Sequence, residues 1–358
     1  MKVLYIGHYK DGTGWGDAAK NNILALDTAG VTVIPRAISY NEKDSETDQK
    51  ILELEQQSTE GCDVCIQHTL PCNYVYNSNF KNIGYLATES SDFCDTGWHK
   101  NINMMDELWV PSAYVREACV KSKVTIPIKI APHCLNVESY INSPDHGKVQ
   151  QLLNSFNFVF IGDFIERKNI KALLRAFHTE FHPKENVNLF IKTSGIKTEE
   201  LESYCDSVKR GLKLRNSYKK EIHICGRIDK INYISVLKQC HCFVMPSRGE
   251  GFCIPALEAM CLGIPSLYTQ GMALDEFCVG ESVCSKDEAC FGGMGSLSNL
   301  YTSNSTWKEI DVKDLQLKMR ASYMKNLDQE TRNKCQKEAR KYSHKNIGKL
   351  FKGLLNDK

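Results

Sequence analysis

Residues 245–265 read Met-Pro-Ser-Arg-Gly-Glu-Gly-Phe-Cys-Ile-Pro-Ala-Leu-Glu-Ala-Met-Cys-Leu-Gly-Ile-Pro. The apolar run 242–245 predicts a strand, and Pro255 suits the first turn of a following helix. The loop between them contains Gly249 and Gly251, which let a ligand approach the backbone. Such a helix start presents free N–H groups and a partial positive charge. The segment therefore predicts an anion-binding site at the carboxyl end of a strand.

Two carboxylates frame this segment. Glu250 lies in the loop, and Glu258 lies about one turn inside the predicted helix, on the face turned toward the loop. Acids beside a phosphate site are explained if they accept hydrogen bonds from sugar hydroxyls, while backbone amides and a lysine hold the phosphates. The alternative is an exposed loop acid and a helix-surface glutamate.

Short apolar runs alternate with helical patterns along the whole chain of 358 residues. The length favours two domains, and the alternation predicts an α/β fold with parallel sheets and crossover helices. The predicted strands are Val3–Ile6, Val31–Ile34, Val64–Gln67, Asn82–Tyr85, Glu107–Val110, Ile128–Ala131, Phe158–Ile161, Val187–Lys192, Ile222–Cys225, Cys242–Met245 and Ser266–Tyr268. The predicted helices include Trp15–Ala29, Ala113–Lys121, Ile170–Phe177, Lys197–Gly211, Ile231–Gln239 and Ile254–Cys261.

A turn-rich polar stretch near residues 142–152 predicts the boundary between the domains. We expect one domain at 1–142 and a second at 150–334, because a strand followed by glycine opens each half. The tail is basic, with apolar side chains at helical spacing. This pattern needs a surface to pack on, so we expect a C-terminal helix within 335–358.

Composition constrains the partners and the compartment. A net charge of +2 neither requires nor excludes nucleic acid. Of the 16 cysteines, Cys62 and Cys65 form a C-x-x-C pair, which indicates either a metal or redox site or simply reduced thiols in a cytoplasmic protein. No run of about 18 apolar residues occurs, so we expect no membrane span, and the N-terminus is typical of a first strand.

The pattern Glu250-x7-Glu258, with Gly251 and Phe252 after the first glutamate, resembles the signature of retaining glycosyltransferases with the GT-B fold, in family four. The resemblance implies two Rossmann-like domains facing a central cleft. It also implies that the last helix, within 335–358, crosses back to the first domain. The first domain would bind the acceptor and the second a nucleoside-diphosphate sugar donor, with no metal and no further cofactor. No Asp-x-Asp metal motif is evident in the candidate loops, so we expect metal-independent chemistry.

Residues 160–177 resemble a second element of the family, which carries a lysine for the donor diphosphate. This position is Lys168, which would neutralise charge on the leaving group; the alternative is a solvated surface lysine. The family usually has arginine where this chain has Asp163, and Arg167 is the candidate to supply the missing charge. Asp163 mildly favours an inactive protein, whereas Lys168 with the two glutamates favours an active one.

The resemblance also implies roles for weaker matches. His68 ends a strand and would lie near the reacting sugar, or would be satisfied locally. The loop after the first strand carries Gly14 and Gly16, which would lie against the donor and acceptor, or form a simple flexible loop. Glu89 would contact the acceptor. The full set is catalytic Glu250, Lys168 and His68; donor-binding Glu258, Gly251, Phe252, Arg167, Gly226, Arg227, Gly14 and Gly16; and acceptor-binding Glu89.

The implied reaction transfers a hexose or similar sugar to a hydroxyl of a glycan, lipid, protein or modified DNA base, with retained configuration. One alternative is another enzyme of the same fold, such as a sugar-nucleotide epimerase or a phosphorylase. Another is an inactive module that binds sugar nucleotides or nucleic acid. Nucleic acid is expected only as an acceptor, in which case the basic stretch 209–220 is where it would bind; otherwise that stretch is a solvated face.

Overall fold

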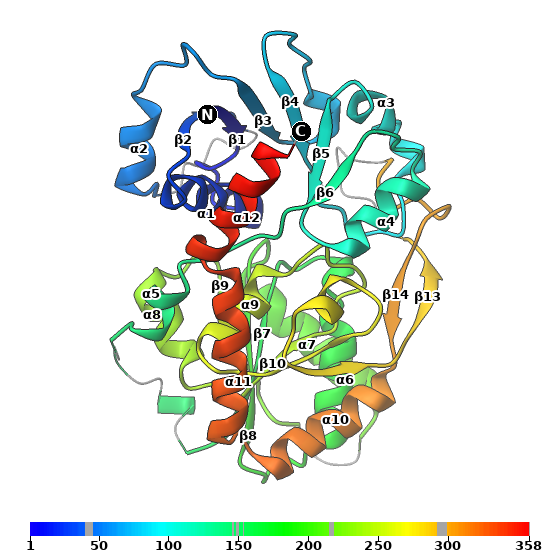
Figure 1. Ribbon diagram of the computed structural model, residues 1–358. Helices are drawn as coiled ribbons and strands as arrows, with labels where there is room; N and C mark the ends of the chain where they lie inside the picture. The colour runs from blue at the N-terminus through cyan, green and yellow to red at the C-terminus, as the bar shows by residue number, and fades with distance from the viewer. Residues whose placement is uncertain are drawn as a thin grey trace. The chain divides into compact units, whose positions relative to one another are not determined.

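The computed structural model describes residues 1–39, 46–144, 147, 150–152, 154–214, 218–291 and 299–357. The chain divides into two compact units (Figure 1). Unit 1 comprises Met1–Val137, Ala289–Thr306 and Arg340–Lys358, and unit 2 comprises Glu138–Glu288 and Trp307–Ala339. Within the described residues, no helix is both long and apolar enough to cross a membrane.

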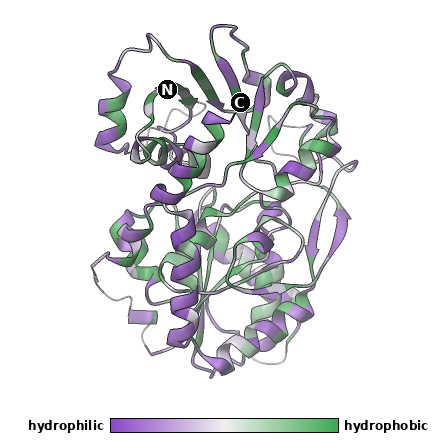
Figure 2. Ribbon diagram, viewed as in Figure 1, coloured by the Kyte–Doolittle hydropathy of each residue, from purple (hydrophilic) through white to green (hydrophobic). Residues whose placement is uncertain are grey.

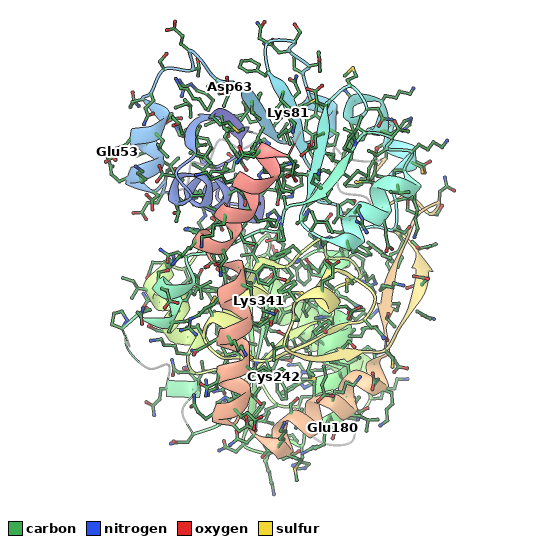
Figure 3. All side chains as sticks on the ribbon, viewed as in Figure 1. Glu53, Asp63, Lys81, Glu180, Cys242 and Lys341 are labelled. Atoms are coloured by element: carbon green, nitrogen blue, oxygen red, sulfur yellow. The ribbon has the colours of Figure 1, made fainter. Side chains whose placement is uncertain are left out.

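Unit 1 is built on a six-stranded parallel sheet in the order β2-β1-β3-β4-β5-β6. The order reverses direction between β1 and β3, which makes the carboxyl ends of these strands a switch point. The amino ends of β3 and β4 lie at the other edge of the sheet, where Figure 3 labels Asp63 and Lys81. The strands are β1 (Lys2–Gly7), β2 (Thr32–Ala37), β3 (Val64–His68), β4 (Lys81–Tyr85), β5 (Glu107–Val110) and β6 (Ile128–Ile130).

The helices of unit 1 include the C-terminal one, which packs on the first. Gly348 of α12 makes this approach possible, because a Cβ there would lie 2.1 Å from the carbonyl oxygen of Ala25 in α1. Phe351 of α12 is buried, with its ring centroid 5.3 Å from that of Trp109. The tail thus buries its apolar side on unit 1. The helices are α1 (Gly14–Thr28), α2 (Gln49–Glu55), α3 (His99–Ile102), α4 (Ala113–Lys121) and α12 (His344–Asn356).

Unit 2 has a second six-stranded parallel sheet, in the order β12-β11-β10-β7-β8-β9. Both sheets are parallel and flanked by helices, which confirms the predicted α/β class. Here the order reverses between β7 and β10, whose side chains are entirely buried. Figure 2 shows these central strands as hydrophobic, as expected for a sheet covered on both faces. The strands are β7 (Phe156–Ile161), β8 (Val187–Thr193), β9 (Ile222–Cys225), β10 (Cys242–Met245), β11 (Ser266–Thr269) and β12 (Gly280–Val283).

The helices of unit 2 pack on this sheet and on one another. Helix α10 lies against α6, and Arg320 of α10 donates to the Glu180 carboxylate at 2.6 Å and also pairs with Glu185. Glu180 is labelled in Figure 3. The helices are α5 (Val137–Ile141), α6 (Ile170–Glu180), α7 (Thr198–Leu212), α8 (Lys230–Leu237), α9 (Ile254–Cys261), α10 (Val312–Lys325) and α11 (Gln329–Ala339).

A two-stranded hairpin follows the second sheet. It pairs β13 (Ser285–Ala289) with β14 (Thr306–Ile310), and Lys308 bonds Asp287 at 2.7 Å across it. Both strands are largely hydrophilic in Figure 2. The sequence did not predict this hairpin, because Ser-Lys-Asp-Glu-Ala carries no apolar alternation.

Candidate functional site

The candidate donor site lies in unit 2, at the switch point between β7 and β10. The loop after β7 contains a 3₁₀ turn, Glu166–Lys168, and the loop after β10 contains Glu250. These loops leave the carboxyl ends of adjacent parallel strands. In open α/β sheets, this crevice is where ligands bind.

The turn that carries Lys168 is fixed by the residue after it. Asn169 adopts a left-handed conformation (φ +53°), which asparagine tolerates better than most residues. Its side chain accepts from the Ala172 N–H and caps α6. The turn therefore ends abruptly where the helix starts, and the side chains of Arg167 and Lys168 are directed toward the neighbouring loop.

Glu250 lies among cations. Its Oε1 accepts from Lys168 Nζ at 2.6 Å, and Arg167 Nη1 lies 3.4 Å from the same oxygen. Arg167 also donates to the Gly249 carbonyl at 2.6 Å. Burial favours the protonated form of Glu250, but the charges of Lys168 and Arg167 outweigh it and lower the pKa of this carboxyl. Two cations share one buried carboxylate, so this cluster carries a net positive charge.

Glu258 on α9 is bound by two tyrosines. Its Oε1 accepts from the Tyr140 hydroxyl at 2.5 Å and its Oε2 from the Tyr233 hydroxyl at 2.6 Å. Burial and the nearby Glu258 charge raise the pKa of Tyr233, which keeps the hydroxyl protonated as a donor. A carboxylate oxygen can accept more than one hydrogen bond, so a carboxylate is a suitable acceptor for ligand hydroxyls. The sequence indicated the glutamate but not the tyrosines, which come from α5 and α8.

The remaining predicted donor residues divide into buried and accessible ones. Phe252 is buried and stacks on Phe277 with ring centroids 4.6 Å apart, so it packs in the core. Gly251 is also buried. Gly226 has φ +89° after β9, a conformation that favours glycine, and the next residue, Arg227, is exposed.

Asp163, which replaces the usual arginine, is exposed and accepts from the Ser194 hydroxyl. Arg167, four residues later, lies against Glu250 together with Lys168. Whether Arg167 replaces the missing arginine stays a prediction.

In unit 1, His68 lies at the carboxyl end of β3 and is buried. Its Nδ1 is 2.7 Å from the Tyr5 hydroxyl, and its ring lies 4.3 Å from that of Tyr85 and stacks on His133. Burial lowers the pKa of His68 well below its usual value, and that of His133 to about 3. The lowered pKa favours the neutral imidazole, which can donate or accept a hydrogen bond but carries no positive charge.

The glycines of the first loop serve different purposes. A Cβ on Gly16 would lie 2.0 Å from the Asp11 carbonyl oxygen, so this glycine allows α1 to pack against its own preceding loop. A Cβ on Gly14 would meet no described atom within 4 Å. Gly14 is therefore the position of the two with room for a ligand.

The Glu89 carboxylate, predicted to contact the acceptor, is bound within unit 1. Its Oε2 accepts from the Tyr301 hydroxyl at 2.5 Å. Tyr301 belongs to the segment 299–306, which also bonds the loop after Glu89 through Thr306 N–H to Ser91 Oγ at 2.9 Å. The sequence offered no signal for this partner, more than 200 residues away.

The cysteines form no evident reactive site. All sixteen are free thiols, and Cys62 and Cys65 are buried. In the described part of the chain, one group combines three possible metal ligands, Cys205, Glu221 and His223, within 4.8 Å. The carboxylate of Glu221, however, already pairs with the buried Lys209 at 3.1 Å and with His178. We interpret the group as an ion-pair network that joins α6, α7 and β9.

Comparison with known proteins shows what the second unit resembles. Residues 155–289 match the family model of Glycosyl transferases group 1. This segment of the chain is therefore similar to group 1 glycosyl transferases. The segment contains the β7 and β10 loops, with Lys168, Glu250 and Glu258. An uncharacterized glycosyltransferase of Methanocaldococcus jannaschii is 25% identical over 194 residues, which are 52% of this chain and 45% of the relative. The match thus spans about half the length of that relative.

Solved structures extend the likeness to the whole chain. Anabaena HepE in complex with UDP superposes with a TM-score of 0.70 at 13% identity, over 99% of each chain. A sucrose-phosphate synthase from Thermosynechococcus elongatus gives 0.65 at 13% identity, over 99% of this chain and 98% of that one. At such identities the likeness shows the fold. The chain has the GT-B fold, so the segment that matches the group 1 model is accompanied by a second Rossmann-like unit.

Proposed function

We propose that this protein is a retaining glycosyltransferase that moves a sugar from a nucleoside diphosphate to a hydroxyl acceptor. The observation that carries the proposal is the cluster of Lys168, Arg167 and Glu250 at the β7–β10 switch point, within the segment that matches the group 1 model. A structure of similar fold was solved with UDP-glucose, which is consistent with a nucleotide-sugar donor.

The cluster suits departure of a diphosphate. Two cations and one carboxylate leave one positive charge in excess, which would attract the diphosphate and stabilise the charge that develops as the sugar leaves. Groups placed in advance where charge develops contribute about 3–4 kcal/mol each in well-studied enzymes. Glu250 would hold Lys168 in place before the donor arrives and accept from a sugar hydroxyl afterwards.

Glu258 suits recognition of hydroxyls. The tyrosine hydroxyls bonded to it orient its carboxylate, which would accept from donor hydroxyls. Exposed Arg227 and Gly226, at the end of β9, would contact the nucleotide. In unit 1, neutral His68 and the loop at Gly14 would contact the transferred sugar and the acceptor.

In the proposed reaction the bond between the anomeric carbon and the diphosphate oxygen breaks, and a bond to the acceptor oxygen forms on the same face. The acceptor proton passes to the departing diphosphate. The residues named above bind, orient and neutralise charge, which is catalysis by proximity and electrostatics. The reaction needs no metal in this scheme. The free thiols fit a reducing compartment, and we propose a cytoplasmic location.

A DNA acceptor has little support from the basic stretch 209–220. Lys209 pairs with Asp206 and Glu221, and Lys220 pairs with Glu202. Residues 215–217 of the stretch lie outside the described residues. We therefore propose a glycan, lipid or protein hydroxyl ahead of a DNA base.

The test is to incubate the protein with UDP-, GDP-, ADP- and TDP-sugars, with and without EDTA, and to follow nucleotide release and the sugar product by NMR. Slow release of nucleoside diphosphate from one class, unaffected by EDTA and with an α-donor giving the α-product, supports the proposal. A changed sugar still attached to its nucleotide would instead identify an epimerase. Formation of a sugar 1-phosphate from a glycan and inorganic phosphate, without any nucleotide, would identify a phosphorylase.

A further inference from the structure

Arg248 is a buried arginine in the donor loop to which the proposed chemistry assigns no role. It is 6% exposed and directly precedes the Gly249–Glu250 segment. Its guanidinium donates to two carboxylates, through Nε to Glu309 at 2.5 Å and through Nη1 to Glu166 at 3.1 Å. Nη1 also donates to the Glu166 carbonyl oxygen. The side chain thus binds the start of the turn that carries Lys168.

The backbone of Arg248 binds the same turn. Its N–H donates to the Arg167 carbonyl at 2.7 Å, and the hydroxyl of the preceding Ser247 donates to that carbonyl at 3.2 Å. The loop with Glu250 and the turn with Lys168 are therefore held together through Arg248 at two places. The 2.6 Å contact between Lys168 and Glu250 depends on this alignment.

The hairpin strand β14 supports Arg248 from the other side. The Lys308 N–H donates to the Arg248 carbonyl at 2.7 Å, and the guanidinium carbon lies 5.7 Å from the centre of the buried Trp307 ring. Glu309, which binds Arg248 through Oε2, also accepts from Asn169 through Oε1 at 3.4 Å. One strand thus contacts both donor loops.

The charges distinguish the role of Arg248 from those of Lys168 and Arg167. The latter two share one carboxylate, so positive charge remains for a donor. Arg248 instead faces two carboxylates, Glu309 and Glu166, which more than balance it. Its geometry and charge are those of a structural tie, not of a phosphate ligand.

We propose that Arg248, supported by Glu309 of the β13–β14 hairpin, is the positioning residue of the donor site. It acts through the turn of Lys168 and does not contact the donor. The expected effect of Arg248 on donor binding rests on the proposed function. Its expected effect on the turn does not depend on any ligand.

The first experiment is a double-mutant cycle with isothermal titration of the nucleotide found in the release assay. Arg248→Gln should weaken nucleotide binding about tenfold in the wild-type background but less than about threefold in the Lys168→Ala background, because residues that act through one another are not additive. Glu309→Gln keeps an acceptor for Arg248 and should have a smaller effect. An equal loss in both backgrounds would overturn the proposal.

The matched control is Arg320→Gln. Arg320 of α10 also bonds two carboxylates, those of Glu180 and Glu185, but it lies away from the donor loops. It should lower the melting temperature without changing nucleotide affinity. If it weakened nucleotide binding as much as Arg248→Gln, loss of stability would explain both effects and the proposal would be wrong.

The second experiment is hydrogen exchange of the unliganded protein, which separates this proposal from the proposed function. Arg248→Gln should accelerate exchange in peptides that cover 162–170 at least threefold and leave α10 unchanged, and Arg320→Gln should show the reverse. Unchanged exchange in 162–170 would overturn the proposal whether or not a nucleotide binds. Failure of wild-type protein to bind any nucleotide sugar, with the expected exchange pattern, would overturn the proposed function alone.

Discussion

The two switch points of this molecule occupy equivalent places in their sheets but have opposite chemistry. In unit 2, the loops after β7 and β10 bring together charged groups, with Lys168 and Arg167 around Glu250. In unit 1, His68 at the end of β3 lies among uncharged aromatic rings, those of Tyr5, Tyr85 and His133. The same topology thus provides a charged site suited to a diphosphate and a neutral site suited to hydroxyls.

The largest effect is expected when a positive charge is removed from the donor site of unit 2. Lys168→Ala should lower kcat about 10²- to 10³-fold, because one preorganised group at the leaving oxygen is lost. Turnover would be measured by nucleotide release. Lys318→Ala is the control, since Lys318 pairs with Asp314 on α10 and should retain wild-type turnover. Wild-type kinetics in the Lys168 variant would remove this residue from the site.

A second change tests recognition of hydroxyls within unit 2. Glu258→Ala should weaken nucleotide-sugar binding about tenfold, the equivalent of one charge-assisted hydrogen bond of roughly 1.5 kcal/mol. Tyr140→Phe should have a smaller effect, because it removes only one of the two hydroxyls that orient the carboxylate. Titration calorimetry gives both values. Equal affinities in the Glu258 variant and the wild type would show that the donor does not reach α9.

The neutral site in unit 1 predicts a pH dependence of stability. Burial lowers the pKa of His8, His68 and His133 in the folded protein, whereas the unfolded chain takes up protons near pH 6.5. The unfolded state therefore binds more protons as pH falls below 6.5. The free energy of unfolding should drop by about 1.4 kcal/mol per pH unit for each histidine that is still neutral in the folded protein at that pH.

Tryptophan fluorescence can measure this drop for unit 1 alone. The protein has four tryptophans, and Trp307 is the one in unit 2, so Trp307→Phe leaves only reporters in unit 1. Urea unfolding would give the free energy of unfolding at each pH between 7 and 5. Adding His133→Asn should reduce the dependence of this free energy on pH by the equivalent of up to one proton taken up on unfolding. An unchanged slope would show that His133 is not neutral in the folded state.

The smallest expected effect concerns the departure at position 163. If Arg167 supplies the cationic charge, Asp163→Arg should change kcat/KM by less than about threefold, since Asp163 is exposed and bonded to Ser194. Steady-state kinetics with the preferred donor would measure it. A gain of tenfold or more would mean that Arg167 is committed to Gly249 and Glu250 and does not replace the missing arginine.

Much of the fold was predictable because buried parallel strands leave a clear signal. Runs such as Phe158–Ile161 and Cys242–Met245 are apolar throughout and lie in β7 and β10 as predicted. The hairpin escaped prediction because its strands are polar and partly exposed. Its residue Glu309 therefore could not be connected with the donor loop before the structure was known.

The site was predictable where a residue belongs to a recognisable local motif, and less so elsewhere. Lys168 and Glu250 were expected to act together and lie 2.6 Å apart, but their roles stay predictions. The tyrosines on Glu258 and the partner of Glu89 depend on contacts more than 20 residues apart, which local patterns do not encode. Phe252 and Gly16 belong to the predicted set, but the fold itself requires these residue types. Phe252 packs on Phe277, and only glycine fits the close backbone contact at position 16.

The central claim is that the β7–β10 switch point binds a nucleoside diphosphate. Titration calorimetry of UDP, GDP, ADP and TDP against wild-type protein, Lys168→Ala and Glu258→Ala tests it most directly. The account predicts that one nucleotide binds the wild type, and that each variant binds it at least about tenfold more weakly. Binding of equal strength to all three proteins, or no binding to any of them, would contradict the account.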